Sequence, residues 1–279
     1  MKSKRNVYCE YRFWNRFFEI ESQDEILKDR LARRLWDQFY LFLEDSILNF
    51  NIRKCDVDSG TLGGKALMAF FQQRGGANIN FLSKNYPSLS SISNSDDDLL
   101  NSVFLTDESA DYCNAISRNK GVLVFNLDMV FSANHVYVNN GESMSQENGI
   151  TWDYLLKIKD KNPSISYCNS LVIADRYLLF DRKDKKGNYL KNDDVFDYNL
   201  RPIFQALLPN SLDNDICFNI CIVAEKQCEN IEEKIVQLQY MIAEIRPNLV
   251  FSVNIYNSKK LHDRSILTNN ILLDRKSVV

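Results

Sequence analysis

Histidine is scarce in this chain, which has only His135 and His262 among its 279 residues. Neither histidine has a partner at the spacing of a zinc ligand set, and no Cys-x-x-Cys pair occurs. A structural zinc site is therefore not expected. The cysteines number 7, which is odd, and several lie in apolar runs, so the sequence predicts buried free thiols in a reducing compartment.

Long apolar runs and an excess of basic charge are missing as well. No stretch approaches the ~18 apolar residues of a membrane span, and Met1–Arg5 leads into a polar, aromatic run, unlike the apolar core of a signal peptide. We therefore expect a cytoplasmic protein without membrane contact. The net charge is −3, so a nucleic-acid partner needs a local basic patch. The candidates are Arg30, Arg33 and Arg34, or Arg182, Lys183, Lys185 and Lys186.

The length favours two domains, because single domains usually have about 100–200 residues. Strands and helices alternate in the predicted pattern, which indicates an α/β fold. A polar run at 139–149 is the candidate linker, so the expected domains are residues 1–140 and 150–279.

Hydrophobic periodicity gives the expected elements. In the first half we expect a strand at 6–9, helices at 13–18, 23–50, 65–73 and 107–117, and strands at 103–105 and 122–126. In the second half we expect helices at 152–158, 200–208 and 231–245, and strands at 216–224, 249–255 and 264–273. The apolar run at 170–180 is expected to be a buried strand followed by a turn or helix. The Ser, Asn and Asp-rich run at 83–98 is expected to be a loop.

Acidic residues follow the predicted strands of the first half. Glu10 ends the first strand, and Asp107 comes just after a later one, with Asp111 one helical turn further on. Glu44 or Asp45 adds an acid from the long helix. Converging carboxylates would hold Mg²⁺ or Mn²⁺, which could activate water for phosphodiester cleavage. The alternative is that Glu10 and Asp107 are strand-end or helix-cap residues and that Glu44 is solvated.

These segments resemble PIN-like domains. The opening VYCEYRFWNRFFE is similar to the first strand and helix of that family, and FLTDESADYCNAISRNKGVLVF resembles its later strand–acid–helix–strand segment. The resemblance covers roughly residues 5–130 and implies a three-layer α/β fold with a parallel sheet. It also implies a metal-dependent ribonuclease site in which Glu10, Glu44 or Asp45, Asp107 and Asp111 are ligands.

A second resemblance concerns the run LHDRSILTNN near the C-terminus. Phospholipase D-type enzymes use His-x-Lys-x4-Asp, and His262, Arg264 and Asn269 stand at those three positions. With Asp263 and the earlier strand ending at Asp175, the run resembles the phospholipase D-like domains found behind microtubule-interacting and trafficking modules. This implies an α/β domain that binds phosphate or a partner. An Asp175–Arg264 or Asp263–Arg264 ion pair is the alternative.

We therefore predict a metal-dependent nuclease, acting on RNA rather than DNA, with a C-terminal partner- or phosphate-binding domain and a place in prokaryotic defence. Alternatively, both domains are degenerate and form a non-catalytic interaction or sensor module that binds a protein. A third hypothesis is a phosphodiesterase site that two copies of His262 form across a homodimer. The run GTLGGKA at 60–66 lacks the spacing of a phosphate-binding loop.

Overall fold

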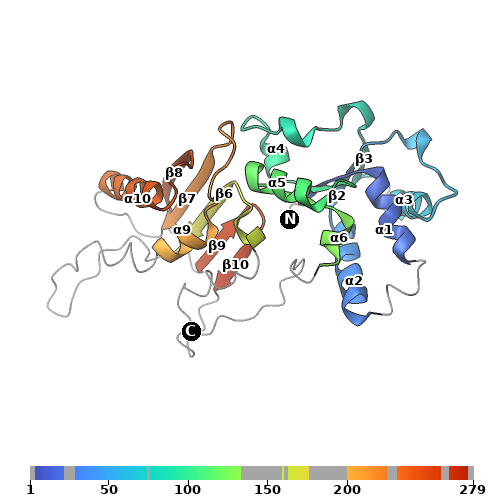
Figure 1. The fold of residues 1–279 in the computed structure, drawn as a ribbon, viewed down its shortest axis with the longest axis horizontal. Coiled ribbons are helices and arrows are strands. Elements are labelled where there is room, and N and C mark those ends of the chain that lie inside the picture. The colour runs from blue at the N-terminus through green and yellow to red at the C-terminus, as the bar shows by residue number, and fades with distance from the viewer. Residues whose placement is uncertain are drawn as a thin grey trace. The chain divides into compact units, whose positions relative to one another are not determined.

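Two separate sheets organise the computed structural model, which describes residues 4–21, 29–73, 76–132, 159, 163–175, 200–224, 231–258 and 264–275 (Figure 1). The contacts divide the chain into a first unit, Met1–Ser117 with Val122–Asn140, and a second unit, Arg118–Gly121 with Gly141–Val279. Both units mix helices and strands, so the α/β class is confirmed. The expected helix at 152–158 and the candidate linker at 139–149 lie outside the described residues.

The sheet of the first unit has five parallel strands in the order β3-β2-β1-β4-β5. The strands are β1 (Asn6–Cys9), β2 (Ile47–Phe50), β3 (Ile79–Phe81), β4 (Val103–Leu105) and β5 (Leu123–Phe125). Central strands with both faces covered are expected to be apolar throughout. All three residues of β4 are accordingly buried.

Helices cover both faces of this sheet (Figure 1). They are α1 (Tyr11–Glu21), α2 (Arg30–Glu44), α3 (Leu62–Gln73), α4 (Asp97–Leu100), α5 (Ala110–Lys120) and α6 (Leu127–Val130), with short 3₁₀ turns at Lys54–Asp56, Ser83–Asn85 and Leu89–Ser91. Trp14 of α1 contacts the rings of Phe50 in β2 and Phe70 in α3. Tyr8 points to the opposite face, because side chains alternate along a strand, and there it stacks on Phe104.

The expected long helix at 23–50 is wrong at its C-terminal end. Helix α2 ends at Glu44 and is followed by strand β2 from Ile47. The N–H of Ile47 donates to the carbonyl of Arg5, which places the run Ile-Leu-Asn-Phe beside β1. Apolar residues in this run fit a helical period as well as a buried strand, and periodicity alone cannot separate the two for short segments.

The sheet of the second unit is mixed, in the order β10-β9-β6-β7-β8. Strands β6 (Ser170–Ala174), β7 (Phe218–Ala224) and β8 (Phe251–Asn257) are parallel, whereas β9 (Arg264–Thr268) and β10 (Leu272–Arg275) are antiparallel. The helices of this unit are α9 (Arg201–Leu207) and α10 (Ile231–Ile245), with a 3₁₀ turn at Pro163–Ser166.

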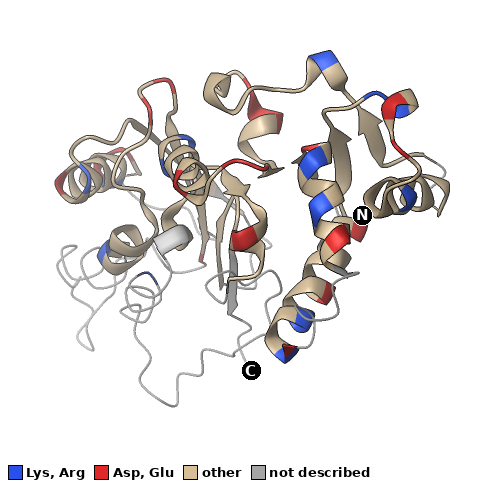
Figure 2. Ribbon diagram, turned by 45° about the vertical axis from the view of Figure 1, so that its right-hand side comes forward, with Lys and Arg blue, Asp and Glu red and all other residues tan. Residues whose placement is uncertain are grey.

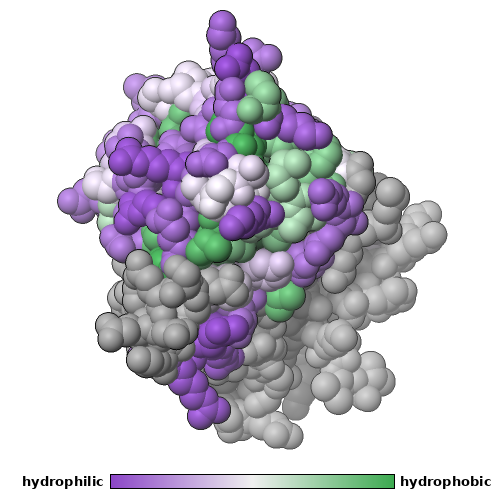
Figure 3. Space-filling model, turned by 90° about the vertical axis from the view of Figure 1, so that its right-hand side faces the viewer, coloured by the Kyte–Doolittle hydropathy of each residue, from purple (hydrophilic) through white to green (hydrophobic). Residues whose placement is uncertain are grey.

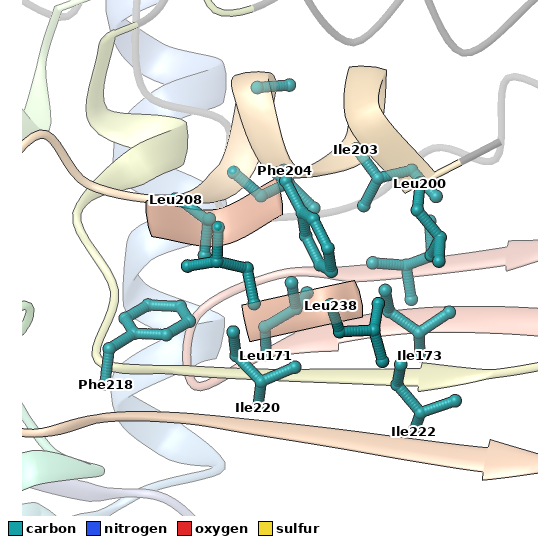
Figure 4. Packing of buried hydrophobic residues seen from close by; sticks show 14 of the residues in the cluster. Leu171, Ile173, Leu200, Ile203, Phe204, Leu208, Phe218, Ile220, Ile222 and Leu238 are labelled. Carbon is teal, nitrogen blue, oxygen red and sulfur yellow. The ribbon is translucent and has the colours of Figure 1, made fainter. Parts of the chain in front are cut away.

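One face of this second sheet carries the core of the unit. Figure 4 shows Phe204 and neighbouring residues of α9 packed over strands β6 and β7, with Leu238 of α10 beside them. Arg246 fixes the ends of both helices, because its guanidinium donates to the carbonyls of Leu208, Gln205 and Ile245. The segment Arg118–Gly121 joins the same unit, where Lys120 pairs with Asp213 at 3.0 Å and Asp215 at 3.1 Å.

The single expected strand at 264–273 is instead a hairpin. Strands β9 and β10 are separated by a turn in which the hydroxyl of Thr268 accepts the N–H groups of Asn270 and Ile271. The side-chain amide of Asn and the hydroxyl of Thr favour such turns, because they form hydrogen bonds with nearby backbone groups. A run of apolar residues on each side hides this turn from periodicity.

Charges of both signs are interspersed along the described chain (Figure 2). The described atoms on the face in Figure 3 are mostly hydrophilic, with smaller hydrophobic areas between them. No helix in the described ranges is both long enough and apolar enough to cross a membrane.

Cys9, Cys113 and Cys168 are buried free thiols, whereas Cys55 is an exposed free thiol. Burial raises the pKa of the Cys168 thiol from 9.0 to about 12, against the opposing effect of Lys159. The neutral thiol therefore belongs to the folded state. Its contribution to stability is fully present below pH 9.0 and is lost as the pH rises toward about 12.

Cys168→Ala is accordingly expected to flatten the alkaline loss of stability. One pKa unit corresponds to about 1.4 kcal/mol, so the wild type should lose up to about 3 kcal/mol more than the variant between about pH 9 and pH 11. The measurement is the free energy of urea unfolding as a function of pH. The control is Cys55→Ala, whose curve should run parallel to that of the wild type. Parallel curves for all three proteins would contradict the assignment.

Candidate functional site

The candidate site lies where the strand order of the first sheet reverses. From β1 the chain builds β2 and β3 on one side and then returns to place β4 and β5 on the other. In open α/β sheets, ligands bind at the carboxyl ends of the strands that flank such a point. Here those ends are followed by Glu10 after β1 and by Thr106 and Asp107 after β4.

Glu10 and Asp107 are brought together at this edge. The Glu10 carboxylate accepts the backbone N–H of Asp107 through Oε2 at 2.9 Å. The backbone N–H of Glu10 donates to the carbonyl of Leu105 at 2.9 Å. Asn51, which follows β2, accepts the N–H of Tyr11 at 2.8 Å. Loops that follow β1, β2 and β4 are therefore held together by hydrogen bonds.

Two arginines of α1 pair with Asp107. Arg12 Nε lies 3.0 Å from Asp107 Oδ2, and Arg16 Nη1 donates to Asp107 Oδ1. Arg12 and Arg16 are four residues apart, so they project from one face of the helix. The Asp107 side chain is only 15% exposed, whereas those of Arg12 and Arg16 are 82% and 50% exposed. The acid is therefore covered and its cations face the solvent. We call Glu10, Arg12, Arg16, Asp107 and Tyr112 the switch-point site.

Two tyrosines lie within electrostatic reach of Glu10. Tyr112 is 37% exposed at the start of α5. Burial raises the pKa of Tyr112, and the charges of Glu108, Cys113 and Glu10 raise it further. This places Glu10 within electrostatic reach of its phenol. Burial likewise raises the pKa of Tyr86, with Cys9, Glu10 and Tyr8 adding to the effect.

The sequence pattern predicted that Asp107 and Asp111 share one face of a helix, and this prediction is wrong. Helix α5 begins at Ala110, so Asp107 precedes it by three residues. Ser109 caps the helix, because its hydroxyl accepts the N–H of Tyr112 at 3.2 Å and its carbonyl accepts the N–H of Cys113. The N–H of Asp107 is instead taken by Glu10. Asp111 itself is exposed in the first turn of α5.

Glu44 and Asp45 lie at the other edge of the sheet. They precede β2, whose first residue, Ile47, pairs with Asn6 at the start of β1. Glu10 follows the last residue of β1. Because a strand rises about 3.3 Å per residue, four residues separate the two edges by roughly 13 Å. The structure therefore does not bring Glu44 or Asp45 together with Glu10 and Asp107.

The residues at this edge do not fit a Mg²⁺ or Mn²⁺ site as they stand. Within the described ranges, no group of three or more His, Cys, Asp or Glu side chains could hold a metal ion. Both oxygens of Asp107 contact guanidinium groups. Two positive charges beside a carboxylate oppose the approach of a divalent cation.

Of the site residues predicted in the second half, His262 and Asp263 lie outside the described residues. Asp175 follows β6, and Arg264 begins β9. Ala174 pairs with Ser265, so Asp175 and Arg264 occupy adjacent register positions at one edge of the sheet. The third position of the motif, Asn269, is tied into the hairpin, since it accepts the N–H of Asn169 and donates to the carbonyl of Gly121.

Gly63 and Gly64 in the run GTLGGKA belong to helix α3, which begins at Leu62, earlier than predicted. Both glycines are buried. The carbonyl of Gly63 accepts the indole N–H of Trp14 at 2.7 Å. The small residues allow α1 and α3 to pack closely, which agrees with setting the run aside as a phosphate loop.

Sequence reasoning missed Arg12 and Arg16. The signal for them is an Arg-x-x-x-Arg spacing on the helix that directly follows a strand-ending acid. Its importance depends on the adjacency of β1 and β4, because only that adjacency places Asp107 beside α1.

Comparisons with known proteins add no identification. No family model, no curated protein and no solved structure matched this chain. The resemblances to PIN-like and phospholipase D-like domains therefore remain expectations.

Proposed function

We propose that the first unit binds single-stranded nucleic acid, preferably RNA, at the switch-point site and acts as a non-catalytic recognition module. The observation that carries this proposal is the convergence of Arg12 and Arg16 on one carboxylate at the carboxyl edge of the sheet. Arginine forks match carboxylate and phosphate alike. A pair that already holds a carboxylate therefore has the geometry to hold a phosphate.

The arginines have donors to offer. A guanidinium has five N–H groups, and each arginine uses one nitrogen on Asp107. Among the described residues neither Arg12 nor Arg16 has a further hydrogen-bond partner. Their high exposure directs the remaining donors to solvent, where a phosphate can contact them before it takes the place of the Asp107 carboxylate.

Tyr112 supplies the second element that single-strand binding uses. Base–aromatic stacking tolerates any sequence and contributes about 1–3 kcal/mol per base. Tyr112 is partly exposed and within electrostatic reach of Glu10. A site that offers both positive side chains and an exposed aromatic ring suits a single strand better than a duplex, whose bases are already stacked.

The test is binding of a labelled single-stranded RNA to Arg12→Gln and Arg16→Gln variants, followed by fluorescence anisotropy. Each substitution removes a charge-assisted hydrogen bond, so the affinity should fall about tenfold or more per variant. The matched control is Arg33→Gln on α2. It removes the same charge from an exposed pair with Asp37 and should leave the affinity within about twofold.

Salt gives a second readout of the same proposal. The slope of log affinity against log salt should become shallower by about 0.7 for each arginine removed, because each phosphate contact on a single strand releases counterions from the nucleic acid. Equal affinities for the wild type, both α1 variants and Arg33→Gln would refute binding at this site.

Metal-dependent cleavage of RNA is a second candidate. It is favoured by the adjacency of Glu10 and Asp107 at the switch point. It would require Asp107 to leave both arginines and a further ligand to join, and the described residues supply no such group. A thermal shift with Mn²⁺ that is lost in Asp107→Ala would support it.

We further propose that the second unit binds a partner or phosphate at the edge that carries Asp175 and Arg264.

A further inference from the structure

We infer that the switch-point site selects the terminal phosphate of a strand over its internal phosphodiesters, and that Asp107 sets this selectivity. The inference rests on the proposed function, because it names the part of the nucleic acid that the two arginines bind. Two exposed arginines alone would indicate neither a preference for a terminal phosphate nor a role for Asp107 in that preference. Both are inferred from the contact of the two arginines with the single carboxylate of Asp107.

The arginines converge on one small anion. Arg12 contacts Oδ2 and Arg16 contacts Oδ1 of the same Asp107 carboxylate. Two oxygens on one carbon are close neighbours, whereas successive phosphodiesters are a nucleotide apart. Arginines arranged to follow a backbone would be spread along it. The observed pair is arranged instead to grip a single group with several terminal oxygens.

Asp107 competes with any anionic ligand for the two arginines. A ligand that displaces its carboxylate leaves a 15% exposed acid without its cations, beside the Glu10 carboxylate. Such an acid is costly to leave unpaired. A phosphodiester carries one negative charge, so it gives the arginines no more charge than the Asp107 carboxylate that it displaces. A phosphate monoester carries about −1.5 to −2 at pH 7 and three acceptor oxygens, so it offers the arginines more than Asp107 does.

The experiment compares RNA strands of one sequence that differ only at their ends. One has a 5′-phosphate, one a 3′-phosphate and one hydroxyls at both ends, each with an internal fluorophore. The wild type should bind one or both phosphorylated strands about tenfold more tightly, as expected for about one extra charge near the arginines at the protein surface. The two phosphorylated strands show which end is the ligand.

The Asp107→Asn variant removes the competing charge while keeping a side chain of the same shape. Its affinity for the hydroxyl-ended strand should rise, and its preference for a terminal phosphate should fall to about twofold or less. An unchanged preference in Asp107→Asn would overturn the role of Asp107. Urea unfolding of the variant checks that it is folded.

Competition on the wild type keeps the inference testable even if the variant does not fold. A nucleoside monophosphate should displace the labelled strand at about tenfold lower concentration than a dinucleoside phosphodiester does. Equal competition, together with equal affinity for all three ends, would overturn the inference while the Arg12→Gln and Arg16→Gln losses still supported the proposed function. No binding of any strand would overturn both.

Discussion

Replacing Gly64 by alanine is expected to destabilise the first unit by about 3 kcal/mol or more. A glycine-to-alanine change inside a helix ordinarily stabilises by about 1 kcal/mol, so the expected sign is the reverse of the usual one. An alanine Cβ at Gly64 would lie 1.8 Å from the carbonyl oxygen of Asp58 and 2.7 Å from its carbonyl carbon. Both are backbone atoms and cannot rotate away.

Urea unfolding followed by circular dichroism measures this change, and Gly60→Ala is its matched control. A Cβ at Gly60 first meets the Asp58 side-chain oxygen at 3.0 Å, which can move. The control should therefore stay within about 1 kcal/mol of the wild type. A Gly64→Ala protein as stable as Gly60→Ala would mean that α3 does not approach Asp58 so closely.

Periodicity and strand-end signals predict much of this fold. The strands at Asn6–Cys9 and Val103–Leu105 and the helix at Ile231–Ile245 are confirmed with the predicted bounds. These elements have strong patterns and clear stops, such as Pro247 after the last of them. The predicted start of α5 is wrong by three residues, because Asp107 and Ser109 are both residue types that can cap a helix. Only the structure shows that Glu10 takes the N–H of Asp107.

The candidate site depends on information that one sequence does not contain. Glu10 and Asp107 could be named from the sequence because each lies within two residues of the end of a strand. Whether an acid on a helix joins them depends on which end of the helix faces which edge of the sheet. Glu44 ends α2 just before β2, so it is carried to the amino edge. Arg12 and Arg16 gained their importance only from the order of the strands.

A carboxylate pair suggested a cation, and the structure supplies cations from the protein itself. Arg12 and Arg16 neutralise Asp107, so the repulsion that a metal was expected to relieve is already relieved. This change of counterion removes the reason to expect Mg²⁺ at this edge, and it is the basis of the proposal that the two arginines bind a phosphate. The proposal of phosphate recognition follows from the presence of arginines in place of a metal ion, and not from the family resemblance.

Phe204→Ala is expected to destabilise the second unit by about 3–5 kcal/mol, the range for removing a buried aromatic ring. Phe204 is 0% exposed in the cluster between α9 and the sheet (Figure 4). Its ring lies against apolar side chains of a rigid sheet, which cannot collapse into the space that alanine leaves. The loss should therefore include a cavity term as well as the lost burial.

Hydrogen exchange detected by mass spectrometry localises this loss. Peptides covering β6 and β7 should lose protection in Phe204→Ala. The matched control is Tyr240→Ala on α10, which removes an aromatic ring that is 75% exposed and should cost within about 1 kcal/mol. Equal losses in the two variants would mean that the ring of Phe204 is not a core contact. A large loss confined to Phe204→Ala would establish that α9 closes the hydrophobic face of a sheet that mixes parallel and antiparallel strands.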